Sequence, residues 1–318
     1  MLKTLLITPC SDRKCGKTPD FMRATSLISG PIDDVATEWL RKVSENPGKT
    51  KAINMYAGRS FSELRKVTQT GDADLMIISA GLGLVGGDEM VPNYGITVSR
   101  GSVESVFNKI SSKDVREQDW WRSLKIHGGE QFDFNKSVDF KKYDLILLML
   151  TKSYSKMIVD ELSQINEFGI KKLRLVGVGI EKYLPEKLKP CVLPYDQRLN
   201  GPDSGYQGTM TDLPARCAVD FINCVKSNPE LGIDLETDIK FVSDRLSKLR
   251  MPIVPTRQKL SDDEVKNFID DNWFGAGTTH QGSLKNLRES GKACEQGRFG
   301  KIFREVKRLK LEQGELNL

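Results

Sequence analysis

Five short apolar runs, spaced along the chain, constrain its fold more than any other feature. They are TLLIT (4–8), ADLMIISA (73–80), YDLILLML (143–150), KLRLVGVG (172–179) and the shorter CVLP (191–194). Each run is continuous rather than alternating, as is typical of strands covered on both faces. Helical periodicity lies between them, at residues 35–43, 60–69, 102–110 and 153–165. This alternation predicts an α/β fold with a three-layer parallel sheet.

Polar and glycine-rich segments follow the predicted strands. PCSDRKCG follows the first strand, GLGLVGGDEMVPNYG the second, TKSYSK the third and GIEKYLP the fourth. The loop LPYDQRLNGPDSGYQGTMTDLPAR (193–216) then carries three aspartates and two arginines among its glycines and prolines. Ligands of open α/β sheets bind outside the carboxyl ends of the strands. We therefore expect these segments to line one pocket, with residues 9–16 and 193–216 meeting over it.

Histidine and cysteine usage narrows the chemistry. The chain has only two histidines, His127 and His280. A Ser-His-Asp or Cys-His mechanism, or a metal site rich in histidine, is therefore not favoured. Six cysteines are scattered without a CxxC pair, which favours free thiols in a reducing cytoplasm. No apolar run approaches the length of a membrane span, so we expect a cytoplasmic protein without a membrane partner. No metal or organic cofactor is expected.

The glycines of GLGLVGG after the second strand form neither a full GxGxxG nor a GxxxxGK[ST] pattern. A nucleotide-binding loop is therefore not indicated. The segment is interpreted as a turn that brings backbone N–H groups close to a ligand, and structural packing is an equal alternative.

Composition changes after residue 228. We expect three parts: an α/β domain (1–228), a helix and linker (229–258) and a basic helical domain (259–318). Ser261 and Glu264 form a capping-box pattern at the start of a helix. A helix, a turn at Gly291 and a second helix then give a helix-turn-helix outline. In the second helix an apolar stripe follows helical spacing: Phe299, Ile302, Phe303, Val306 and Leu309.

Positive charge is concentrated in that last part. Nine Lys and Arg residues against three Glu residues between Gln281 and Lys310 give +6, whereas the whole chain carries +5. A single basic helix is usually a solvated surface. Together with the helix-turn-helix outline, the charge favours contact with a nucleic-acid backbone. The candidate DNA-binding cations here are Lys292, Arg298, Lys301, Arg304 and Arg308, and those after the first strand are Arg13 and Lys14.

Three segments carry a resemblance to a known superfamily. TPCSDRKCG, YAGRSF and ISAGLGLVGGDEMVPNYGIT together resemble the uracil-DNA-glycosylase-like and YaaA-like α/β proteins, over roughly residues 4–100. With the basic helical tail, the arrangement is similar to anti-phage DNA glycosylases, which remove glucosylated hydroxymethylcytosine from phage DNA. The chain lacks the GxDPY-type water-activating motif of ordinary uracil-DNA glycosylases, so the resemblance does not assign the catalytic residue.

The resemblance implies cleavage of the N-glycosidic bond of a modified cytosine in double-stranded DNA. Such cleavage passes through an oxocarbenium-like state that a carboxylate stabilises without a cofactor, after the base has been flipped out of the duplex. The catalytic candidates are Asp12 and Asp212. The candidates for substrate binding are Ser11, Tyr56, Arg59, Ser79, Gly81, Asp88, Asn93, Tyr94, Asp196, Arg198 and Arg216.

Several of these residues have structural alternatives. Asp212 precedes a predicted helix with Pro214 in its first turn, so it serves equally well as an N-cap. Asp12 has the same alternative, Asp196 and Arg198 can pair and stiffen their loop, and Tyr56 and Tyr94 can belong to the core. Two other functions remain open: a base-exchanging or nucleoside-cleaving enzyme acting on RNA or nucleosides, and a non-catalytic DNA-binding defence module.

Overall fold

The computed structural model describes residues 2–253, 255–274 and 278–312. Contacts divide the chain into two compact units, Met1–Pro252 and Ile253–Leu318. The helix expected in a linker over residues 229–258 is α10 (Leu235–Ser247), and it belongs to the first unit. Val242 and Leu246 of this helix are fully buried in the core of that unit.

The first unit is built on a five-stranded sheet with the order β4-β3-β1-β6-β7. Four strands are parallel: β1 (Thr4–Pro9), β3 (Asp74–Ser79), β6 (Leu145–Met149) and β7 (Leu173–Val176). The edge strand β4 (Gly83–Gly86) is antiparallel to β3. The fold is therefore mixed α/β with a mostly parallel sheet, and the expectation of an entirely parallel sheet is corrected at this edge. The fifth predicted strand, residues 191–194, forms only a single bridge between Val192 and Leu175.

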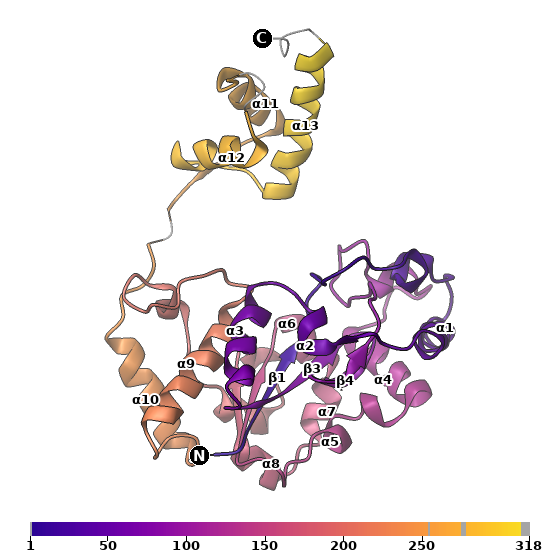
Figure 1. The fold of residues 1–318 in the computed structure, drawn as a ribbon, viewed down its shortest axis with the longest axis vertical. Coiled ribbons are helices and arrows are strands. Elements are labelled where there is room, and N and C mark those ends of the chain that lie inside the picture. The colour runs from indigo at the N-terminus through magenta and orange to yellow at the C-terminus, as the bar shows by residue number, and fades with distance from the viewer. Residues whose placement is uncertain (1, 254, 275–277, 313–318) are drawn as a thin grey trace. The chain divides into compact units, whose positions relative to one another are not determined.

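Helices cover the sheet on two sides, which explains why the strand sequences are continuously apolar. All five residues of β6 are buried. On one side, α3 (Arg59–Gln69) packs against α9 (Leu213–Ser227). On the other side, α4 (Glu117–Gly128) packs against α1 (Ile32–Glu45) and α6 (Lys152–Met157), as Figure 1 shows.

Most predicted helices of the first unit are present. The segments at 35–43 and 60–69 lie within α1 and α3, and the segment at 153–165 is split between α6 and α7 (Val159–Ser163). The helix expected at 102–110 is wrong, because only the 3₁₀ turn Val106–Asn108 forms there.

Main-chain pairing with a neighbouring segment replaces that helix. The Thr97 N–H donates to the Glu104 carbonyl (2.9 Å), and the Val106 N–H donates to the Thr97 carbonyl (3.0 Å). The Ser102 hydroxyl accepts from the Glu104 N–H (3.2 Å). Such local side-chain bonds compete with helix formation.

The remaining elements of this unit are short. They are β2 (Thr50–Lys51), which pairs with β5 (Met90–Val91), the helices α2 (Ala52–Met55), α5 (Phe134–Ser137) and α8 (Glu167–Lys172), and further 3₁₀ turns at 20–22, 24–26, 130–132, 181–183, 186–191 and 197–200. The GLGLVGG segment forms the β3–β4 hairpin. A Cβ atom at Gly81 would lie 2.5 Å from Ile96 and 2.9 Å from Trp39, so packing explains this glycine.

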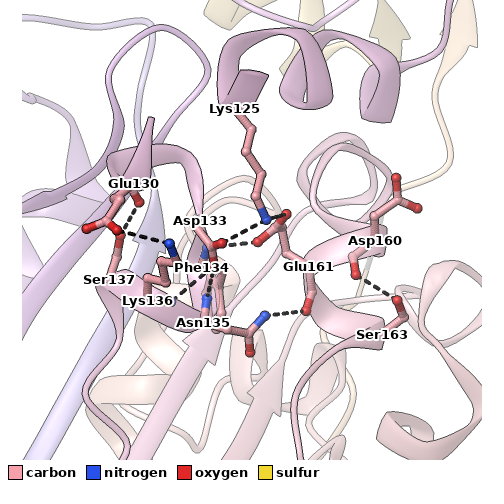
Figure 2. A network of polar contacts seen from close by, with 10 residues as sticks. All are labelled: Lys125, Glu130, Asp133, Phe134, Asn135, Lys136, Ser137, Asp160, Glu161 and Ser163. Atoms are coloured by element: carbon pink, nitrogen blue, oxygen red, sulfur yellow. Dashed lines mark hydrogen bonds and ion pairs between the residues drawn. The ribbon is translucent and has the colours of Figure 1, made fainter. Parts of the chain in front are cut away.

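Two ion pairs, each with a buried acidic residue, connect helices within this unit. Glu161 on α7 is 3% exposed and accepts from Lys125 Nζ of α4 (2.8 Å) and from the Phe134 N–H at the start of α5 (2.9 Å), as Figure 2 shows. Arg174 on β7 donates to Asp238 on α10 (2.6 Å), and both side chains are fully buried. Burial raises the pKa of Asp238, although the Gly232 N–H and Arg174 oppose this shift. Neither pair lies among the predicted site residues.

The second unit has its own core. Its elements are β8 (Gln258–Lys259), α11 (Asp262–Asp271), α12 (His280–Glu289), β9 (Lys292–Ala293) and α13 (Gln296–Glu312), and β8 pairs with β9 in parallel. The capping box of Ser261 and Glu264 is confirmed. Four residues of the predicted stripe on α13 are buried, at 5% exposure or less: Phe299, Ile302, Phe303 and Val306. Leu309 is 41% exposed, so its inclusion in the stripe was wrong.

No helix in the described ranges combines the length and the apolar character that crossing a bilayer requires.

Candidate functional site

The site lies at the carboxyl ends of the central strands. In the sheet β1 lies between β3 and β6, so the chain continues from β1 towards one edge and later returns to the other side. Ile7 of β1 pairs with Met76 on one side and Leu148 on the other. Such a change of direction opens a crevice beside the end of the strand, which is where open α/β sheets bind ligands.

The segment after β1 is held in one conformation by the segment before α3. The Ser11 hydroxyl lies within hydrogen-bonding distance of the carbonyl oxygens of Arg13 (2.7 Å) and Ala57 (2.8 Å). The Ala57 N–H donates to the Arg13 carbonyl (2.9 Å), and the Cys15 N–H donates to the Met55 carbonyl (2.7 Å). Ser11 therefore positions the loop. Asp12 does not cap a helix, because the next helical turn begins at Asp20.

A cluster of hydroxyl groups lies beneath this loop. Tyr94 OH is 2.7 Å from Tyr56 OH and 2.5 Å from Ser79 Oγ. Ser79 Oγ also accepts from the Gly81 and Leu82 N–H groups (3.1 and 2.9 Å). Burial raises the pKa of both tyrosines well above the usual value, so the hydroxyls stay protonated. Both rings are fully buried, and the core alternative describes Tyr56 and Tyr94 better than stacking on a base.

A thiol that follows β1 and a tyrosine that follows β6 contact each other at the carboxyl ends of these strands. Cys10, which follows β1, places its Sγ 3.0 Å from the hydroxyl of Tyr154 on α6. Burial also raises the pKa of Tyr154. Sequence analysis noted Tyr154 in the segment after the third strand but did not include it among the site residues.

A cavity of about 320 Å³ opens beside this cluster. The residues of its lining that carry polar or charged side chains are Asp12, Lys14, Lys17, Thr18, Arg23, Tyr94, Ser102 and Glu104. Asp12 is exposed. Lys14 Nζ lies 4.4 Å from the centre of the Tyr94 ring and donates to the Ser11 carbonyl (3.2 Å). A carboxylate and an ammonium group thus share one cavity, and Lys14 is part of this lining rather than of an outer cationic surface.

Asp212 and Arg216 form a separate buried pair. Asp212 is 4% exposed and Arg216 is 2% exposed. All five N–H groups of the Arg216 guanidinium have acceptors, which are Asp212 Oδ1 (3.1 and 2.8 Å), Asn200 Oδ1 (2.6 Å) and the carbonyls of Thr209 (2.5 Å) and Tyr206. Arg216 therefore ties the loop before α9 to the helix and retains no N–H group for a ligand.

The second oxygen of Asp212 faces Arg59, whose Nε lies 3.7 Å from Oδ2. Asp212 precedes α9 but makes no side-chain capping bond. Its contacts are therefore those of an ion-paired structural carboxylate rather than of an N-cap.

The loops 9–16 and 193–216 contribute to different cavities. Arg59, Tyr206 and Arg216 line a groove of about 460 Å³ between α3 and α9. Asp12 lines the 320 Å³ cavity instead. The segment 55–59 links the two loops, because Met55 and Ala57 bond to the first loop and Arg59 pairs with Asp212.

Two further predicted carboxylates lie outside the cavity lining. Asp88 follows β4, which runs opposite to β3, so it lies at the amino ends of the parallel strands and pairs with Lys51 (2.7 Å). Asp196 pairs with Arg198 (2.8 Å) and accepts from its N–H (2.8 Å). The loop-stiffening alternative for Asp196 and Arg198 therefore describes their contacts.

Sequence analysis missed Arg23 and Glu104. Both lie in irregular segments, and they meet because the main chain bridges Arg23 to Gly95 and Thr97 to Ser105. Asn93, which was among the predicted residues, lies beside the cavity, since a Cβ atom on the lining residue Gly16 would be 3.0 Å from its Nδ2. In the sequence, the segments that contain Arg23 and Glu104 could be linked to the site only because each lies close to a predicted site motif.

Among the described residues, no group of three or more His, Cys, Asp or Glu side chains is arranged to hold a metal ion.

In the second unit, three predicted cations share the exposed side of α13. Lys301, Arg304 and Arg308 are exposed, and their spacing places them on one side of the helix, away from its buried stripe. Arg308 pairs with Glu312 (3.0 Å), whereas Lys301 and Arg304 have no ion-pair partner among the described residues. We refer to these three residues as the α13 cations.

The other two predicted cations make contacts within the unit. Arg298 pairs with Asp262 (2.5 Å) and donates to the Leu260 carbonyl (2.9 Å). Lys292 Nζ lies 5.1 Å from the centre of the Phe268 ring. Both therefore hold α13 and β9 to the rest of the unit.

Comparison of the chain with protein-family models, curated proteins and solved structures finds no match. Evidence for its function comes from its own residues, above all from the cavity beside Asp12 and Lys14 and from the α13 cations.

Proposed function

We propose that this protein is a DNA glycosylase that removes a modified cytosine from DNA, as the sequence resemblance implies, and that it acts in defence against phages. The observation that carries the proposal is the cavity at the carboxyl end of β1, whose lining contains both Asp12 and Lys14. This pair of charges suits a glycosylase, because the transition state is positive on the sugar and negative on the departing base.

The proposed reaction uses these two groups and water. The bond between C1′ of the deoxyribose and the base nitrogen breaks, and its electron pair leaves with the base. The Asp12 carboxylate stabilises the resulting oxocarbenium ion, and the Lys14 ammonium stabilises the anionic base. Water then adds to C1′, and the proton that it loses passes by way of Asp12 or solvent to the base anion. The products are a free base and an abasic site, and no metal or organic cofactor takes part.

The second unit is proposed to hold the DNA. Base removal from a duplex requires a flipped nucleotide and therefore contacts that anchor the backbone on either side of it. The α13 cations are exposed, and two of them form no ion pair among the described residues. Such cations contact phosphates without reading sequence. This supports a polymer substrate over a free nucleoside.

Replacing Lys301, Arg304 and Arg308 together with glutamine is expected to weaken DNA binding and to flatten its salt dependence. Loss of three phosphate contacts reduces the slope of log affinity against log salt by about 2–3. The measurement is a fluorescence-anisotropy titration with duplex DNA at several salt concentrations.

A matched control removes Lys136, Lys141 and Lys171, which are exposed and lie near the amino ends of β6 and β7. This control lowers the net charge by the same amount and is expected to keep most of the original slope. Equal slopes for the α13 variant and the wild type would show that DNA is held without this helix.

The test of the function itself is release of a base. The full-length protein is incubated with unmodified DNA and with phage DNA carrying hydroxymethylated and glucosylated cytosine, and released bases are identified by mass spectrometry. Free nucleosides are tested in parallel. Release from DNA supports the proposal, release from nucleosides alone favours the nucleoside-cleaving alternative, and release from neither favours a DNA-binding module.

A further inference from the structure

We infer that Glu104 determines which substrate enters the cavity, by accepting a hydrogen bond from an N–H or O–H group of the base. The inference rests on the proposed function to the extent that the occupant of the cavity is a nucleobase. It names the chemistry that this occupant must present: a hydrogen-bond donor on the base itself or on a sugar attached to it.

The first observation is an unused acceptor. Glu104 Oε1 accepts from Arg23 Nη1 at 2.6 Å. Glu104 Oε2 is buried and has no hydrogen-bond partner. Buried polar atoms in folded proteins are nearly always paired, and leaving a charged one unpaired is costly. The Glu104 side chain is 23% exposed and lines the cavity, so a small rotation of the carboxylate brings this covered oxygen to a donor on a bound molecule.

The second observation is the space around the carboxylate. A Cβ atom at Gly95 would lie 3.2 Å from Glu104 Cδ and 3.3 Å from both of its oxygens. Gly95 also lines the cavity, and its φ angle lies outside the left-handed range. The glycine therefore lets the carboxylate lie close to the main chain, where a larger side chain would displace it, and it is not required by the backbone conformation.

The third observation is an unpaired acceptor on a residue that follows the second predicted strand. Asn93 Oδ1 is buried and without a partner, and Asn93 Nδ2 lies next to the lining residue Gly16. Asn93 is not itself part of the cavity lining, so Glu104 Oε2 is the acceptor on which the inference rests, and a ligand with more than one donor can satisfy it in more than one orientation. An exocyclic amino group and the hydroxyls of a hexose both have this property, since each carries two or more hydrogens for donation.

The experiment measures binding rather than catalysis. Isothermal titration calorimetry with the full-length protein uses three nucleosides: 2′-deoxycytidine, its N4,N4-dimethyl derivative, which has no amino hydrogen, and its 5-glucosyloxymethyl derivative. The wild type is expected to bind at least one donor-bearing nucleoside more tightly than the dimethyl compound. A loss on dimethylation identifies the amino group as the donor, and a gain on glucosylation identifies the sugar hydroxyls.

Glu104→Gln is expected to reduce this preference by about 10- to 100-fold, which is the range for a hydrogen bond to a charged acceptor. Gly95→Ala, which keeps the charge but displaces the carboxylate, is expected to reduce it as well. The matched control is Asp20→Asn, because Asp20 is 97% exposed and lies near the same arginine, with 3.6 Å between Asp20 Oδ1 and Arg23 Nε. This control is expected to leave the preference unchanged.

The outcomes separate the inference from the proposed function. If Glu104→Gln keeps the wild-type preference, or if the wild type distinguishes none of the three nucleosides, the inference is overturned, even where DNA still releases a base. If the preference depends on Glu104 while no DNA releases a base, the inference holds and the glycosylase proposal fails.

Discussion

Replacing Asp12 with asparagine is expected to lower the rate of base release by about 10²–10³-fold, the usual effect of removing one electrostatic partner of a transition state. Asparagine keeps the shape of the side chain and removes only its negative charge. Asp12 is exposed and caps no helix, so the free energy of unfolding is expected to stay within about 0.5 kcal/mol of the wild type. The measurement is single-turnover release of base from modified DNA, with binding measured separately.

Asp88→Asn is the matched control for this variant. Asp88 is also an exposed aspartate beside a lysine, but it lies at the amino ends of the parallel strands. It is expected to release base at the wild-type rate. Full activity of Asp12→Asn would remove Asp12 from the mechanism. Equal losses in both variants would point to a general effect of charge rather than to chemistry at Asp12.

Local patterns in the sequence predicted the framework of the fold. The apolar runs identified β1, β3, β6 and β7 because strands buried on both faces need no polar positions. The edge strand β4 was not predicted, since GLVG contains two glycines and its pairing with β3 depends on a tight hairpin. The helix expected at 102–110 failed because hydrogen bonds to Thr97, five or more residues earlier in the chain, replace the helical ones.

Sequence analysis could place a candidate site residue only where that residue follows a predicted strand. Asp12 and Lys14 come directly after β1, so their place at the carboxyl edge could be anticipated. The partnership of Arg23 with Glu104 spans 81 residues and arises from two irregular segments lying side by side. Neither periodicity nor a motif encodes such a contact. The burial of Arg216 was equally unpredictable, because charged residues are rarely buried unless every donor finds an acceptor.

The burial of Arg216 distinguishes Asp212 from Asp12, although sequence analysis gave both the same catalytic role. Asp212 shares its Oδ1 with Arg216 at 2.8 Å, and their side chains are only 5% and 2% exposed. Removing one partner of a buried ion pair leaves the other charge without compensation. Asp212→Ala is therefore expected to lower the free energy of unfolding by about 3–5 kcal/mol. Urea unfolding monitored by circular dichroism measures this change.

Asp196→Ala provides the comparison, because it also removes an aspartate paired with an arginine in the same loop. The Asp196 and Arg198 side chains are 41% and 31% exposed. Exposed pairs contribute about 0–1 kcal/mol, and loss of the capping bond to the Arg198 N–H costs typically about 1 kcal/mol. This variant is therefore expected to lower the free energy of unfolding by about 1–2 kcal/mol, less than Asp212→Ala. Burial, rather than pairing itself, accounts for the difference between the two variants.

Activity of the milder variant Asp212→Asn decides between the structural and the catalytic role of this residue. Asparagine retains an oxygen for Arg216, so enough protein is expected to stay folded at low temperature for assay. With a structural role, the folded fraction releases base at nearly the wild-type rate, and the rate falls only as the protein unfolds. A loss of about 10²–10³-fold in fully folded protein would instead place Asp212 in the chemistry, with Arg59 as the group that orients its second oxygen.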